Sequence, residues 1–152
     1  MFSENYSRQT ANASATSTAP DQISEGELAQ LTRSPEAKVR AAVAARSKTP
    51  LTSILRLMTD ESPAVRVGVA RNERPDMPIE MWQDLAGDKS HEVIAAMIAN
   101  PAVPDSVIAK LARHRTKEYS AAARKRMAES NVKSPGILGL VGLVGLVGLG
   151  RR

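Results

Sequence analysis

Apolar positions recur along the middle of this chain with a long, nearly constant period. The arrangement around Leu57 returns around Leu31, Leu85 and Leu111, at steps of 26, 28 and 26 residues. Periods of about 20 to 50 residues are typical of arrays in which small structural units stack on one another. The pattern therefore predicts four repeats, of which residues 50–72 are a representative unit.

Within each unit, two apolar pairs have the spacing of a helix. The first pairs are three residues apart: Leu28/Leu31, Ile54/Leu57, Trp82/Leu85 and Ile108/Leu111. The second pairs are four apart: Val39/Val43, Val65/Val69, Val93/Met97 and Tyr119/Ala123. Both spacings place side chains on one face of a helix with 3.6 residues per turn. Each unit is therefore predicted to be a helix–turn–helix pair, with Trp82 as a core residue.

Turn and capping residues stand at matching places in the units. Seven residues before the anchor leucines are Ser24, Pro50, Pro78 and Pro104. Proline suits the first turn of a helix, where its missing N–H has no partner. Three residues after the anchors are Ser34, Asp60, Asp88 and His114. The first three of these can accept hydrogen bonds from the amides that open the second helix, and His114 is a weaker cap.

A single pair of about 20 residues is too small to bury its apolar face, so successive pairs must cover one another. The chain is therefore predicted to be all-α, a short α-solenoid of about four helix–turn–helix repeats. Alanines in the second helices allow close packing, and Asn72 and Asn100 are interpreted as structural residues at turns. These alanines are Ala41, Ala42, Ala44, Ala70, Ala95, Ala96 and Ala99.

The units VRVGVARNERPDMPIEMWQDLAGD and VIAAMIANPAVPDSVIAKLARH resemble the variant leucine-rich repeats of bacterial proteins, which are HEAT-like helical repeats. The shared pattern is V-R-x-x-V-A-x-N-x-x-x-P followed by L-x-x-L-A-x-D, over residues 24–127. The resemblance implies a right-handed superhelix in which the second helix is a 3₁₀-helix, whereas the sequence alone equally allows an α-helix. Ile94 and Ser120 stand where Arg40 and Arg66 stand earlier, so the last two units depart from the pattern. A founding member holds an iron–sulfur cluster on cysteines, and this chain has no cysteine.

The two ends differ from the repeats in composition. Residues 1–22 are rich in Ser, Thr, Ala and Asn and are predicted to be a disordered tail, and residues 23–129 form the helical-repeat domain. Residues 130–152 are predicted to be a linker and a low-complexity tail of Gly, Leu and Val. Its apolar run of 14 residues, 137–150, is shorter than the roughly 18 residues that span a bilayer. Three interpretations stay open: an unstructured tail, a segment that docks on its own repeats or on a partner, and a weak membrane-interface anchor next to Arg151 and Arg152.

The net charge of +5 is concentrated near one end of the sequence. Residues 1–104 contain 11 Lys and Arg against 13 Asp and Glu, whereas residues 105–152 contain 10 against 3. The cluster comprises Lys110, Arg113, Arg115, Lys117, Arg124, Lys125 and Arg126. It is either a solvated cap on the end of the stack or a positive patch for an anionic partner such as nucleic acid.

Motifs for enzyme chemistry are missing from the sequence. It contains no phosphate-binding glycine loop, nucleophile elbow or dinucleotide fingerprint. His114 and Glu118 could share a helix face and supply two metal ligands, but no third ligand is evident. We therefore expect a non-catalytic scaffold, without metal or cofactor, that binds a protein through one face of the solenoid. The alternative is a nucleic-acid-binding module that uses the basic fourth repeat. The lack of cysteine suits a reducing bacterial cytoplasm.

Overall fold

A computed structural model describes residues 23–133 of the chain. This part contains eight α-helices and no strands, which confirms the predicted all-α fold. The helices are α2 (Glu25–Leu31), α3 (Ala37–Ala44), α4 (Leu51–Leu57), α5 (Pro63–Ala70), α6 (Ile79–Leu85), α7 (His91–Ala99), α8 (Asp105–Leu111) and α9 (Lys117–Lys133). Consecutive helices form four pairs, one for each predicted repeat.

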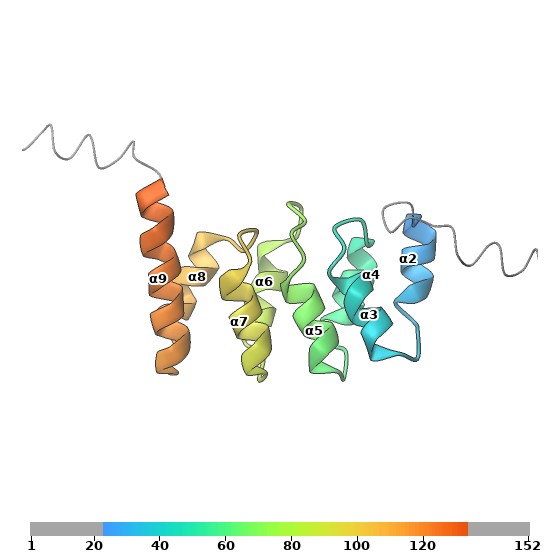
Figure 1. The fold of residues 1–152 in the computed structure, drawn as a ribbon, viewed down its shortest axis with the longest axis horizontal. Helices are drawn as coiled ribbons and strands as arrows, with labels where there is room; N and C mark the ends of the chain where they lie inside the picture. Colours follow the sequence, from blue (N-terminus) through green and yellow to red (C-terminus); the bar gives the residue numbers. More distant parts are fainter. Residues whose placement is uncertain (1–22, 134–152) are drawn as a thin grey trace, which may run out of the picture.

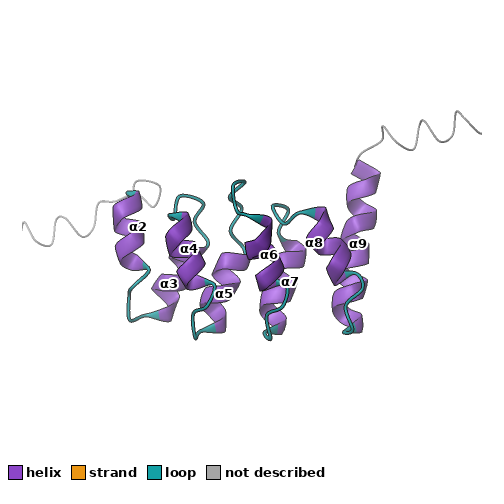
Figure 2. Cartoon of the chain, turned by 180° about the vertical axis from the view of Figure 1, so that it is seen from behind, coloured by secondary structure: helices purple, strands orange, loops and turns teal. Residues whose placement is uncertain are grey.

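The pairs stand in a row (Figure 1). Helices α3, α5, α7 and α9, the second helices of the units, lie side by side in one layer, and each packs against the next. Helices α4, α6 and α8 lie behind them and come to the front when the molecule is turned (Figure 2). The returns between units and the C-terminal end of α9 are on the same side of the row, at the top of Figure 1.

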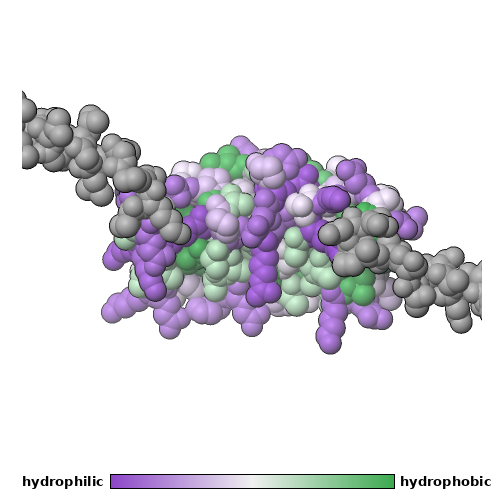
Figure 3. All heavy atoms as spheres, turned by 45° about the horizontal axis from the view of Figure 1, so that its top comes forward, coloured by the Kyte–Doolittle hydropathy of each residue, from purple (hydrophilic) through white to green (hydrophobic). Residues whose placement is uncertain are grey.

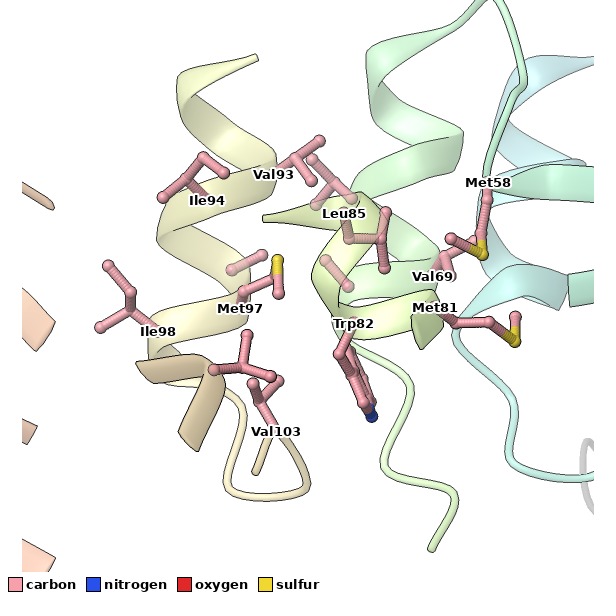
Figure 4. Close-up of a cluster of buried hydrophobic side chains, with 14 of the residues drawn as sticks. Met58, Val69, Met81, Trp82, Leu85, Val93, Ile94, Met97, Ile98 and Val103 are labelled. Carbon is pink, nitrogen blue, oxygen red and sulfur yellow. The ribbon is translucent and has the colours of Figure 1, made fainter. Parts of the chain in front are cut away.

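Most of the apolar pairs read from the sequence form the core of the row, whereas Leu31, Val39 and Tyr119 are only half-buried. Ile54, Leu57, Leu85 and Ile108 are buried, and Trp82, predicted to be a core residue, is only 1% exposed. Figure 4 shows Trp82 and Leu85 of α6 together with the methionines and branched residues of the neighbouring helices. Burying a large apolar side chain contributes about 1.5 to 3 kcal/mol, so this shared core holds the units together.

The starts of the first helices differ slightly from the prediction. Pro50, Pro78 and Pro104 have extended ψ values of 140°, 144° and 142° and stand at the N-cap, one residue before their helices begin. Helix α2 begins instead with a capping box, in which the amide of Ser24 donates to Glu27 (2.9 Å) and the amide of Glu27 donates to Ser24 (3.3 Å). A serine can supply this side-chain cap whereas a proline cannot.

The second helices are α-helices, so the 3₁₀ alternative implied by the family resemblance is wrong for this chain. At the end of α5, for example, the amide of Arg71 donates to the carbonyl of Val67, four residues back, at 3.0 Å. Bonds that reach back three residues occur at the corners, as from Thr59 to Arg56. Apolar residues spaced four apart bury best on a full α-turn, which explains the outcome.

Helix α9 is longer than the other helices and runs on to Lys133. Residues 130–133, which the sequence analysis places at the start of the linker, continue this helix past the predicted domain end at residue 129. Ser130 is accommodated there by a hydrogen bond from its hydroxyl to the carbonyl of Arg126 (2.8 Å), four residues back. The predicted disordered tail at residues 1–22 and the Gly-Leu-Val tail lie outside the described residues.

Spacing within the front layer depends on one glycine. A Cβ atom at Gly68 of α5 would overlap the carbonyl oxygen of Ala41 in α3, so only glycine allows these two helices to lie this close. The equivalent place in α7 is held by Ala96, at the contact between α7 and α5. Ala96 lines a hollow on the surface between α5 and α7.

Candidate functional site

Six of the seven basic residues singled out in the sequence are exposed on the fourth unit. They lie on α8, on the corner that follows it and on α9, and they are Lys110, Arg113, Arg115, Lys117, Arg124 and Lys125. Within residues 23–133, none of the six forms an ion pair with a carboxylate. Arg124 also donates to the carbonyl of Ala112, just past the C-terminal end of α8, at 3.2 Å. The end of the row is thus a surface of positive charge.

The asparagines that end the second helices form a buried ladder between units. The Nδ2 atom of Asn72 donates to the carbonyls of Ala44 (2.8 Å) and Arg46 (2.9 Å) in the preceding unit. The Nδ2 atom of Asn100 donates in the same way to Ala70 and Asn72, at 2.8 Å each. Buried carbonyls require such partners, so the structural role predicted for both asparagines is confirmed.

The seventh basic residue, Arg126, continues this ladder and is not part of the exposed cluster. It stands fifteen residues after its anchor leucine, as Asn100 does. Its Nη1 atom donates to the carbonyls of Met97 (3.1 Å), Ile98 (3.0 Å) and Asn100 (2.7 Å), and its Nη2 atom donates to Val103 (2.8 Å). Burial lowers the pKa of the Arg126 guanidinium. The residue ties α9 to the end of α7 and so performs a structural task.

A second ladder, of ion pairs, links the units along their other edge. Arg40 pairs with Asp60 (2.8 Å) and Arg66 pairs with Asp88 (2.7 Å), so each arginine reaches the aspartate of the following unit. Each aspartate also accepts the amide of the residue two further on, such as Ser62, at 2.9 Å. Burial opposes ionisation of Asp60, but the hydrogen bonds from Arg40 and Ser62 outweigh it, and the pKa of Asp60 lies below its ordinary value.

At the last junction a cluster of ring side chains replaces the ion pair. Nδ1 of His91 lies 2.9 Å from the hydroxyl of Tyr119, and Nε2 lies 3.6 Å from Glu118. The centroids of the Tyr119 and His114 rings are 5.0 Å apart. His114 accepts the amide of Thr116 (3.0 Å) through Nδ1, as the weaker cap predicted from its position. Over residues 23–133 the structure brings together no group of three or more side chains suited to a metal ion.

A groove runs between α5 and α7 on the front layer, and no pattern in the sequence predicts it. Its volume is about 670 Å³. Its apolar lining is Val67, Ala95, Ala96 and Ala99, and its polar lining is Arg71, Glu73, Glu92 and Asn100. Seen from the front and above, this side of the molecule shows pale green areas of small apolar residues between columns of purple, charged ones (Figure 3). The lining residues are individually ordinary, so residue type does not indicate the groove.

A smaller hollow of about 290 Å³ lies in the other layer, between α4 and α6. Leu55, the most exposed large apolar side chain of the described part at 56%, borders it together with Met58 and Leu85. Asp84 and Asp88 provide the polar side. This hollow is less than half the volume of the groove between α5 and α7, which is therefore the better binding candidate.

Comparisons with known proteins add no family or relative to this picture. Neither the protein-family models, nor the curated proteins, nor the solved structures contain a match to the chain. Of the helices in residues 23–133, none combines the length and apolar character needed to cross a bilayer. The candidate sites therefore rest on the geometry of the chain itself.

Proposed function

We propose that this chain is a non-catalytic helical-repeat protein that binds a protein partner through the front layer formed by α3, α5, α7 and α9. The groove between α5 and α7 is the observation that carries the proposal. Its volume of about 670 Å³ is in the range of binding clefts, and its floor is apolar and accessible. Helical repeats commonly use such extended surfaces for recognition.

The lining of the groove favours a polypeptide as its ligand. Small side chains such as Ala95 and Ala99 leave room for bulky apolar side chains of a partner. Glu73 and Glu92 would attract a basic residue of that partner, and Arg71 would attract an acidic one. A segment with apolar residues flanked by charges of both signs satisfies all of these groups.

The resemblance to variant leucine-rich repeats supports this proposal as an analogy of fold. On that basis the row is the short right-handed solenoid of a bacterial scaffold protein, and the lack of cysteine favours the cytoplasm. The resemblance does not provide an activity, because repeat folds are used for many unrelated tasks.

A photo-crosslinking amino acid in the groove provides the test. It would replace Ala95 on the exposed floor, and in a matched control it would replace Gln83, which is exposed on α6 in the other layer. We expect a discrete protein adduct at Ala95 that persists after nuclease treatment, and little at Gln83. Ala99→Trp, which fills the groove, should reduce the adduct about tenfold, which corresponds to a loss of about 1.4 kcal/mol. Equal labelling at both positions, or an adduct indifferent to Ala99→Trp, would refute the proposal.

The six exposed basic residues of the fourth unit favour a second candidate function, the binding of nucleic acid. Lys117 and Lys125 lie on the same face of α9, two turns apart, so together with the corner residues they could follow a row of phosphates. Binding of this kind weakens steeply as salt increases, because phosphate contacts release counterions. Lys117→Gln with Lys125→Gln should reduce retention on RNA or DNA and lower the salt dependence, and unchanged retention would exclude this function.

A further inference from the structure

We infer that the C-terminal tail of this chain, residues 137–150, occupies the groove between α5 and α7 of the same molecule and competes there with the protein partner. The inference rests on the proposed function of the groove. It concerns how access to the groove is regulated.

The chemistry of the tail matches the floor of the groove. Residues 137–150 comprise nine Leu, Ile or Val and five Gly, with no polar side chain. The floor offers Val67, Ala95, Ala96 and Ala99, which are small and apolar. Burial of leucine side chains on such a surface removes apolar area from water, and the glycines keep the segment narrow.

The tail also starts close to the groove. The guanidinium of Arg126 contacts the carbonyl of Asn100, which lines the groove, at 2.7 Å. From Arg126, α9 continues to Lys133, a rise of about 10 Å at 1.5 Å per residue. About four extended residues cover that distance on the way back, at up to 3.6 Å each. Residues 134–136 and the first residue of the tail return the chain to the level of Arg126, and the groove lies beyond α7, about 10 Å further at one helix diameter. The 13 remaining residues of the tail can cross that distance, because they span up to about 45 Å when extended.

The covalent connection makes even weak docking effective. A segment joined through a short linker has an effective concentration of the order of millimolar at a nearby site. If the dissociation constant of the tail for the groove is about millimolar, half of the molecules are occupied by their own tail. A partner then binds with an apparent affinity reduced about twofold, and more strongly reduced if the tail docks more tightly.

Crosslinking in the purified full-length chain tests where the tail lies. The photo-crosslinker again replaces Ala95, with Gln83 as control, and the product is digested and identified by mass spectrometry. We expect an adduct between position 95 and residues 137–150 in the monomer band, with a yield independent of protein concentration. An adduct found only in a dimer band means that a second copy occupies the groove, and it would overturn the inference. The absence of any tail adduct would also overturn the inference. This includes the result in which the tail binds anionic vesicles that are added to the protein.

Variants of the tail test the competition. Leu143→Ser with Leu146→Ser should abolish the intramolecular adduct and raise the yield of partner adduct at position 95 at least about twofold. Leu143→Ile with Leu146→Ile keeps the apolar character and should leave both yields unchanged. If a partner is captured at position 95 but the serine variant keeps the intramolecular adduct, or captures no more partner than the original protein, competition is refuted while the proposed function stands. If the serine variant loses the tail adduct and still captures no partner at position 95, the proposed function itself is contradicted.

Discussion

Removal of the Arg126 side chain tests whether this residue is a structural link or part of a charged surface. In Arg126→Ala, the carbonyls of Met97, Ile98, Asn100 and Val103 lose their donor. Hydrogen bonds that involve a charged group contribute about 1.5 to 3 kcal/mol each, although three of the four here share one nitrogen and the side chain is partly exposed. We therefore expect the free energy of unfolding to fall by about 2 to 3 kcal/mol in total.

Urea denaturation followed by circular dichroism measures this change, and thermal melts provide a second readout. For a folded part of about 110 residues, a loss of this size should lower the melting temperature by roughly 10 °C. Lys125→Ala is the matched control, because Lys125 is adjacent and exposed, and its removal should change stability by less than about 0.5 kcal/mol. Arg126→Asn should retain part of the stability, because Asn100 makes the equivalent bonds at the previous junction.

Two results would refute this reasoning about Arg126. Equal stability of the Arg126→Ala and Lys125→Ala proteins would mean that water satisfies the four carbonyls as well as the guanidinium does. Loss of nucleic-acid binding in an Arg126→Ala protein of unchanged stability would return the residue to the exposed cluster.

Three further predictions concern the contacts between units. Gly68→Ala should destabilise the protein by about 1 to 3 kcal/mol in urea denaturation, because the added methyl group overlaps the carbonyl of Ala41. The control Gly26→Ala, in open space on α2, should stabilise it by about 0.5 to 1 kcal/mol. The reverse order of stabilities would contradict the close approach of α3 and α5. Asp88→Ala should lower the free energy of unfolding by about 3 kcal/mol, since it leaves a buried guanidinium without its carboxylate, and a loss below 1 kcal/mol would show that water replaces the carboxylate. The pKa of Asp60 is lowered in the folded state, so its contribution to stability is present above the unfolded value near 4 and is lost as the pH falls through the folded value. Asp60→Asn should therefore make stability less dependent on pH below about 4, and an unchanged acid limb would count against the ion pair.

The helices and their pairing could be predicted from the sequence because each unit must hide its apolar side chains. Ile54 and Leu57 are spaced for one face of their helix, as are Trp82 and Ile108 with the leucine three residues after each, and all four residues are buried. The end of α9 could not be predicted in the same way. Beyond Met127 the sequence contains no apolar residue at core spacing, and Ser130 and Asn131 are weak helix formers, so the pattern predicts a linker where the helix in fact continues.

The ladders show why residue type is a weaker guide than position in the repeat. The sequence position of Asp60 predicts a helix cap, and Asp60 does accept an amide, but its main partner is Arg40, twenty residues earlier. Arg126 was counted with the cations around it, although it holds the ladder position of Asn100. In both cases the partner belongs to another unit. Aligning the repeats, and asking which residue of one unit faces which residue of the next, would have identified both contacts.

Separate parts of each unit serve stacking and recognition. The anchors, the Arg–Asp pairs and the buried amides are all used in contacts between units, and they leave the outward positions of the second helices without a structural task. Outward positions such as Ala95, Ala99 and Glu92 line the groove. A change on the floor, such as Ala95→Ser, should therefore alter binding by the groove while leaving the free energy of unfolding from urea denaturation within about 0.5 kcal/mol of that of the original protein. Should the free energy of unfolding fall further, stacking and recognition would share residues, and the groove would be a by-product of packing with no binding task of its own.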